Sequence, residues 1–265
     1  MTRRNLPASL GTVLLLCAMK AHAEEGEIVT DRPDVAESSE TVGSRRLQVE
    51  LSTQVETDRL GGHRRTSFRT PVKVRLGVIA RLELHLETDG FARDWGVLPS
   101  GGVGSATGGA DLGLGGKVHL FDQQRLLPST AILLSVSLPV GSAAFTEGNT
   151  SLSPTLAVSW DLGTRWSIGA NLGATIALTE RDIHPDSFRF AAALWRTWAP
   201  LSERLSSFVE PSGEVPLDGS EPALQIQGGV AYLFTPLVQL DLAAIVGLTA
   251  AAADFGMTLG FSFKI

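Results

Sequence analysis

The stretch FGMTLGFSFKI, residues 255–265, decides the fold. Every second residue is large and apolar: Phe255, Met257, Leu259, Phe261, Phe263 and Ile265. The residues between them are small or polar: Gly256, Thr258, Gly260, Ser262 and Lys264. Strict alternation is the period of a β-strand with one apolar face. Such a strand at a sheet edge would invite aggregation. Because a closed barrel has no edges, the stretch predicts the last strand of a β-barrel.

The rest of the chain divides into similar segments. From residue 45 onward we expect about twelve strands of roughly ten residues, separated by turn-forming residues. They fall near 46–56, 66–78, 81–90, 109–120, 129–140, 151–161, 165–177, 187–198, 204–214, 223–234, 238–250 and 255–264. The links between these strands alternate between short and longer ones. This alternation is typical of an all-β, antiparallel transmembrane barrel with short periplasmic turns and longer extracellular loops. Residues 242–253 could instead form a buried helix, but the alternation before them favours a strand.

The N-terminus has the three parts of a secretory signal peptide. Two arginines precede an apolar stretch that is too short to span a membrane as a helix, and Ala21-His22-Ala23 supplies a small-residue cleavage site. We expect residues 1–23 to be removed. Cys17, the only cysteine, leaves with them, so the mature chain should hold no disulfide and no thiolate metal site.

The mature chain is acidic. Loss of Arg3, Arg4 and Lys20 with the signal takes the formal net charge from −6 to −9. This balance argues against binding to nucleic acid, which requires basic surfaces.

Two neighbouring segments separate charged from apolar side chains. In residues 81–87, three leucines alternate with Arg81, Glu83, His85 and Glu87. In residues 72–76, Val72, Val74 and Leu76 alternate with Lys73 and Arg75, whose parity Arg69 shares. A basic side chain facing lipid costs about 2–4 kcal/mol at mid-bilayer, so the charged faces should line the lumen. Antiparallel pairing then places cations beside anions.

Other segments carry polar residues on the same inner parity. They include Asp111, Lys117, Asp161, Glu210, Gln225, Gln227 and Asp241. One interpretation is that these side chains fill and hydrogen-bond a narrow interior. The other is that, with the charged residues at 69–87, they line a solute path in which charge selects what passes. The sequence leaves both open.

Four of the five tryptophans, Trp160, Trp166, Trp195 and Trp198, cluster near two of the short turns. Aromatic side chains accumulate where a membrane meets water. We therefore expect these four to form an interface girdle at the periplasmic end.

The mature N-terminal segment, residues 24–44, is strongly acidic. It could be a disordered periplasmic tail, because its composition offers little to bury. Alternatively, Asp31, Arg32 and Asp34 could enter the lumen, pair with Arg69, Lys73 or Arg75, and act as a plug.

Short motifs are spread over nearly all of the mature chain. They are Thr30-Asp31-Arg32-Pro33-Asp34; Arg75-Leu76-Gly77-Val78 followed by Arg81-Leu82-Glu83-Leu84; Ser137-Leu138-Pro139-Val140-Gly141-Ser142; Asn171-Leu172-Gly173; Glu210 with Gly213; and Gln239-Leu240-Asp241-Leu242. Together they resemble the outer-membrane proteins grouped under the MetA pathway of phenol degradation, usually described as transporters. The resemblance implies a barrel and the passage of small solutes, aromatic or hydrophobic ones among them, without defining the solute.

Three functional classes follow. A channel or transporter in the outer membrane of a Gram-negative bacterium is favoured, with membrane lipids, a small solute and the assembly machinery that reads the C-terminal strand as partners. A non-conducting surface-binding barrel is the alternative; residues 91–108, with Trp95, form the loop that could bind a partner or fold inward as a constriction. An enzyme is disfavoured because His85 and His119 accompany no Gly-x-Ser-x-Gly or HExxH motif. We expect no cofactor and no metal.

Overall fold

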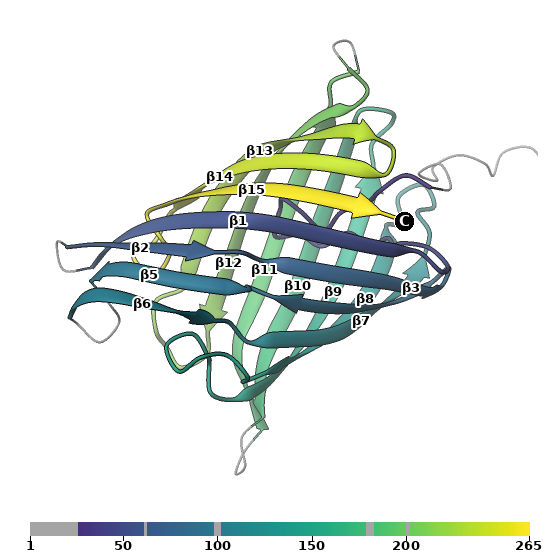
Figure 1. The fold of residues 1–265 in the computed structure, drawn as a ribbon. Coiled ribbons are helices and arrows are strands. Elements are labelled where there is room, and N and C mark those ends of the chain that lie inside the picture. Colours follow the sequence, from purple (N-terminus) through teal and green to yellow (C-terminus); the bar gives the residue numbers. More distant parts are fainter. Residues whose placement is uncertain (1–25, 61–62, 98–101, 179–182, 200–201) are drawn as a thin grey trace, which may run out of the picture.

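The chain forms a closed antiparallel β-barrel (Figure 1). A computed structural model describes residues 26–60, 63–97, 102–178, 183–199 and 202–265. The predicted signal peptide lies outside these residues. The strands are β1 Leu47–Leu60, β2 His63–Arg69, β3 Val72–Ile79, β4 Leu82–Thr88, β5 Phe91–Val97, β6 Val103–Gly109, β7 Leu112–Phe121, β8 Ser129–Leu138, β9 Thr150–Asp161, β10 Trp166–Leu178, β11 Ile183–Thr197, β12 Leu205–Pro216, β13 Ala223–Thr235, β14 Val238–Gly247 and β15 Phe255–Lys264. Among the described residues, no helix is long and apolar enough to cross a membrane.

The barrel has twelve strands, because three of them are each broken into two elements. β2 and β3 meet at Thr70-Pro71, β4 and β5 at Asp89-Gly90, and β6 and β7 at Ala110-Asp111. Pro71 has no N–H to give to the ladder. Gly90 has a φ of 64°, and a Cβ there would lie 2.3 Å from the Thr70 carbonyl oxygen. The predicted all-β fold and strand number are confirmed.

Beyond these breaks, β2, β5 and β6 continue as a sheet with the far end of β1, and Figure 1 shows the four side by side. We refer to this part as the hairpin extension. Residues 57–65, which lie between two of the predicted strands, and the predicted loop at residues 91–108 belong to strands over most of their described length, so the prediction is wrong there. Residues 61–62 and 98–101 lie outside the described residues. Backbone pairing satisfies N–H and C=O groups whether the side chains face lipid or water, so the strands do not end where the bilayer does.

The last strand closes the barrel. β15 pairs with β1 over ten positions, from Gln48 opposite Lys264 to Thr57 opposite Phe255. The backbones of Leu47 and Ile265 exchange hydrogen bonds of 3.0 and 2.8 Å. β14 pairs with strands on both sides, so the helical interpretation of residues 242–253 is wrong.

The barrel is apolar outside and charged inside. On β15, Met257 and Leu259 are 46% and 54% exposed, whereas Ser262 is fully buried. The largest fully buried side chains are mostly charged or polar and include Arg75, Lys117 and Glu83. This inversion of a soluble protein's pattern follows from lipid surrounding the wall.

Candidate functional site: the lumen and its inner segment

Residues 27–42, here called the inner segment, run inside the barrel against its wall. Ile28, Ala36 and Val42 are at most 5% exposed. At one end the Ile28 N–H donates to the Pro236 carbonyl at 2.7 Å. At the other the Val42 N–H donates to the Glu83 carboxylate at 2.8 Å. The described part of the acidic N-terminal region therefore lies in the lumen rather than in the periplasm.

Asp31 is the centre of a charge cluster in the lumen. Its carboxylate lies 2.9 Å from Lys117 Nζ, 3.2 Å from Lys73 Nζ and 3.3 Å from Arg75 Nη1. Its side chain is 1% exposed. Burial alone would raise the pKa of Asp31, but the charges of Arg75, Lys117 and Lys73 outweigh burial and hold that pKa well below its usual value. Asp31 is therefore an ionised anchor between β3 and β7.

The same cations also contact carboxylates of the wall. Arg75 bonds Glu83 at 2.8 Å and Glu50 at 3.1 Å. Lys73 lies 3.5 Å from Glu87, which is directly opposite it on β4. The predicted cross-strand charge pairing is thus present in this register. Sequence reasoning missed Glu50, although its even parity on β1, shared with Ser52, is the signal that would have found it.

A second anchor holds the middle of the inner segment. The Glu210 carboxylate accepts hydrogen bonds of 2.8 Å from the N–H groups of Val35 and Ala36, and Gln227 donates to it as well. Asp34 accepts a 2.8 Å hydrogen bond from Trp195 Nε1. Burial, and then the nearby Glu210 carboxylate, raise the pKa of Asp34 well above its usual value.

Trp195 lies inside the barrel, so its predicted place in the interface girdle is wrong. Its ring stacks on Phe208 with centroids 4.6 Å apart. It has the same parity as Ala191 and Ala193, which are buried. That parity is the signal that distinguishes Trp195 from Trp198, whose Nε1 donates to Ser207.

Small polar groups hold the far end of the inner segment. The Ser39 hydroxyl lies 2.8 Å from that of Ser129 and 2.6 Å from that of Ser159. The Ser39 carbonyl oxygen is 2.9 Å from His119 Nδ1. Ser39 is fully buried, so its contacts with Ser129, Ser159 and His119 form only when the inner segment is docked in the lumen.

Arg32 contacts the opposite wall. It donates a 2.6 Å hydrogen bond to the Thr258 hydroxyl, while Gln239 donates to Thr30 at 2.9 Å. Asp241 is 3% exposed and lies against Gly260, where a Cβ would be 2.3 Å from its carboxylate. Glycine at 260 therefore makes room for the inward carboxylate.

His85 lies in the lumen without the geometry of a catalytic triad. Its Nε2 is 2.8 Å from Ser135 Oγ and 4.0 Å from Glu87 Oε1. A triad needs the carboxylate on the other ring nitrogen. Among the described residues, no group of three or more His, Cys, Asp or Glu could hold a metal ion.

Four residues predicted to line the lumen lie elsewhere. Arg69 is on β2 in the hairpin extension, where it binds Asp94 at 2.7 Å instead of the inner segment, and the other three lie at strand ends. Arg81 is in the turn between β3 and β4, is half exposed and pairs with Asp122 at 2.7 Å. Asp161 ends β9 at the same rim and is exposed. Asp111 lies outside the strands, where it accepts hydrogen bonds from the N–H groups of Gly141 and Glu147. Each of these three sits past the last inward position of its strand, so parity alone misplaced it.

Trp95 does not constrict the lumen. It belongs to β5, not to a loop, and faces away from the side on which Asp94 binds Arg65 and Arg69 at 2.6 and 2.7 Å. Its ring lies under Arg93, whose Cζ is 5.6 Å from the ring centroid. The predicted inward fold is therefore wrong.

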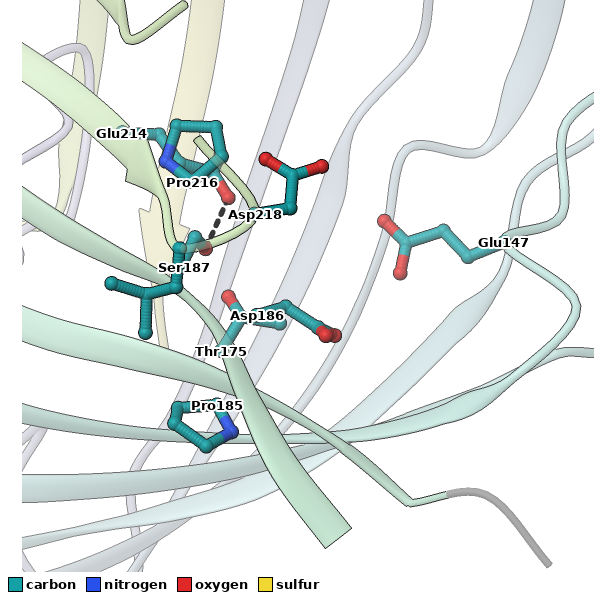
Figure 2. Close-up of a pocket in the computed structure, with 9 residues that line it drawn as sticks. Glu147, Thr175, Pro185, Asp186, Ser187, Glu214, Pro216 and Asp218 are labelled. Carbon is teal, nitrogen blue, oxygen red and sulfur yellow. Dashed lines mark hydrogen bonds between the residues drawn. The ribbon is translucent and has the colours of Figure 1, made fainter. Parts of the chain in front are cut away.

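The end of the barrel opposite the β3–β4 turn contains an acidic cavity of about 480 Å³ (Figure 2). Its wall is formed by β10, β11, β12 and two loops, and Figure 2 shows Glu147 facing Asp186 and Asp218 across it. Ser187 donates a hydrogen bond to Glu214. Burial, and then the neighbouring carboxylates, raise the pKa of Glu147. Gln225, which donates to Ser212 at 3.2 Å, lies below this mouth.

An apolar outer wall around a charged, occupied interior defines a transmembrane β-barrel of the outer-membrane type. The chain belongs to the family described as "Putative MetA-pathway of phenol degradation", whose model matches residues 30–265.

Solved barrels resemble the fold at low sequence identity. The COG4313 outer membrane channel from Pseudomonas putida F1 has a TM-score of 0.69 at 13% identity, covering 86% of this chain and 98% of that one. A NanC porin has a TM-score of 0.54 at 11% identity, covering 83% and 100%. A KdgM porin has a TM-score of 0.50 at 8% identity, covering 82% and 98%. No curated protein sequence matches this chain.

Proposed function

We propose that this protein is an outer-membrane channel for passive passage of small solutes, in which the inner segment sets the constriction. The observation that carries the proposal is Asp31, an ionised carboxylate on the inner segment rather than on a strand, buried among Lys73, Arg75 and Lys117 of the wall. The similar solved structures are described as a channel and as porins. Signal-directed export through residues 1–23 and assembly through β15 are parts of the same proposal.

The geometry suggests how passage is controlled. Solute enters through the acidic cavity at one end of the barrel and meets the inner segment in the other half. Around the inner segment, charges of both signs are paired with one another, so a passing ion gains little free energy by replacing one partner of a pair. Passage then depends on displacing the segment or on a narrow route beside it. Small polar or aromatic solutes fit this arrangement, and the stacked Trp195 and Phe208 offer an aromatic surface beside Asp34. No catalytic step is part of the proposal.

A non-conducting barrel is the second candidate, and the extent of anchoring favours it. The inner segment bonds to side chains on β1, β3, β4, β7, β8, β9, β10, β11, β12, β14 and β15. A segment held from so many sides could close the lumen permanently.

Conductance in planar bilayers separates the two candidates. Residues 24–265 should give small discrete steps, and the chain lacking residues 24–42 should give larger ones. Equal steps from both chains would exclude the inner segment as the constriction. Absence of conductance from both, with each migrating as a folded barrel, would establish the non-conducting alternative.

A further inference from the structure

The outer face of the hairpin extension carries three arginines, and two of them, Arg59 and Arg64, lie directly opposite each other and are here called the arginine patch. Val55 and Leu51 on β1 face outward and are 40% and 37% exposed. Arg59 has the same parity and is exposed. Arg59 lies directly opposite Arg64 of β2, so both side chains leave the sheet on its outer face.

The third arginine joins this face through β5. Phe68, four residues after Arg64 on β2, pairs with Arg93. Arg93 is exposed and lies over the Trp95 ring at 5.6 Å from its centroid. Arg93 therefore lies on the same face as Arg59 and Arg64 but lower, at the level of Phe68, where its guanidinium lies over the tryptophan ring.

Charge is segregated between the two faces of the extension. Asp94 faces inward and binds Arg65 and Arg69 at 2.6 and 2.7 Å. Asp58 is directly opposite Arg65 and shares that inner face. On the outer face, no ion pair or hydrogen bond with another described residue engages the guanidinium of Arg59 or Arg64. Two like charges directly opposite each other destabilise a strand pair unless an anion bridges them.

The arginine patch lies at the height of the membrane boundary that is opposite the rim at Leu47. Arg59 is twelve residues along β1 from Leu47, which is at the rim of the other end. At about 3.3 Å per residue and a tilt of about 45°, this corresponds to roughly 28 Å along the membrane normal, against an apolar band about 25 Å tall. Below the patch, the Phe68 and Phe91 rings form an aromatic pair with centroids 6.4 Å apart. The surface thus changes from aromatic to basic where acyl chains give way to headgroups.

We propose that the arginine patch binds the phosphate groups of lipid headgroups in the outer leaflet. Guanidinium groups bind phosphate oxygens in bidentate pairs, and a phosphate between Arg59 and Arg64 relieves their mutual repulsion. The acyl chains of the same lipid lie on Phe68 and Phe91. The inference concerns the outer wall and holds whether or not the lumen conducts.

Binding of diphosphoryl lipid A to the detergent-solubilised barrel tests the proposal. The double variant R59A/R64A should bind it about tenfold or more weakly than the parent chain, because two charge-assisted contacts are lost. The matched control R46A/R165A removes two exposed arginines at the other rim and should change the dissociation constant by less than about twofold. Equal affinity of R59A/R64A and the parent, with both folded, would overturn the proposal.

A second measurement needs only the parent chain. Lipid A stripped of both phosphates should bind about tenfold more weakly than diphosphoryl lipid A, and equal binding would refute a phosphate site. Inorganic phosphate at millimolar concentration should not displace the lipid, since it lacks acyl chains to pack on the aromatic pair. Displacement would assign the patch to free phosphate and overturn the lipid assignment.

Discussion

Replacing Asp31 with asparagine should release the inner segment from the wall. The substitution keeps the shape of the side chain but removes the charge that faces Lys73, Arg75 and Lys117 at 3.2, 3.3 and 2.9 Å. At an effective dielectric constant near 20, each contact corresponds to roughly 5 kcal/mol of attraction, most of which offsets the cost of burying the ions. The net loss of docking free energy is therefore much smaller than the sum of the three attractions.

Removing one partner of a buried ion pair costs about 3–5 kcal/mol. Arg75 keeps Glu50 and Glu83, and Lys73 keeps Glu37, so we expect the lower figure. About 3 kcal/mol corresponds to a shift on the order of 100-fold in the equilibrium between docked and released segment.

Thiol labelling measures that equilibrium. Ser39 is fully buried, and without Cys17 the S39C variant has a single thiol. A hydrophilic maleimide should label this thiol on the order of 100-fold faster when D31N is added, because only the released segment reacts. E203Q, a charge removal at an exposed carboxylate in a turn, is the control and should leave the rate unchanged. If D31N labels within about threefold of its parent while folded, Asp31 is not an anchor.

Two further outcomes use the same S39C background, and a third concerns the stability of the barrel. Trp195→Phe keeps an aromatic ring at this position but removes the donor to Asp34, so labelling should rise about fivefold, the equivalent of about 1 kcal/mol; an unchanged rate would exclude this hydrogen bond as an anchor. The pKa of Asp34 is raised when the inner segment is docked, so docking is favoured at low pH and is lost as the pH rises through the pKa of the docked state. The labelling rate, corrected for the thiolate fraction, should therefore increase from pH 5 to pH 8. The D34N variant should abolish this trend. A Cβ at Gly77 would lie 1.6 Å from the Gly43 carbonyl oxygen, whereas one at Gly169 has nothing within 4 Å; G77A should lower the thermal unfolding midpoint and G169A should not.

Prediction from sequence was most reliable where a strand crosses the membrane. Residues 255–264 were predicted with the bounds that β15 has, and the charged face of residues 82–87 is inside. It was least reliable at strand ends. Arg81 and Asp161 share the parity of inward residues but lie at the rim, because parity gives a direction and says nothing of height.

The candidate site was only partly visible in the sequence. Charge suggested that Asp31 and Arg32 could enter the lumen, and the basic residues at 73 and 75 were named as partners. Lys117, which is 86 residues from Asp31, and Glu210, which is 175 residues from Val35, could not be assigned to these contacts. Nothing local distinguishes one inward carboxylate from another.

The sequence by itself determined that this chain is a barrel with a charged interior, because alternation is a local property set by the two sides of each strand. Only the tertiary structure decided which charges meet, since closure and register bring β3, β7 and β12 around a segment that precedes them all. It also decided that β2, β5 and β6, with the far end of β1, stand as a sheet beyond the barrel. That outcome depends on backbone pairing between strands, which side-chain polarity does not reveal.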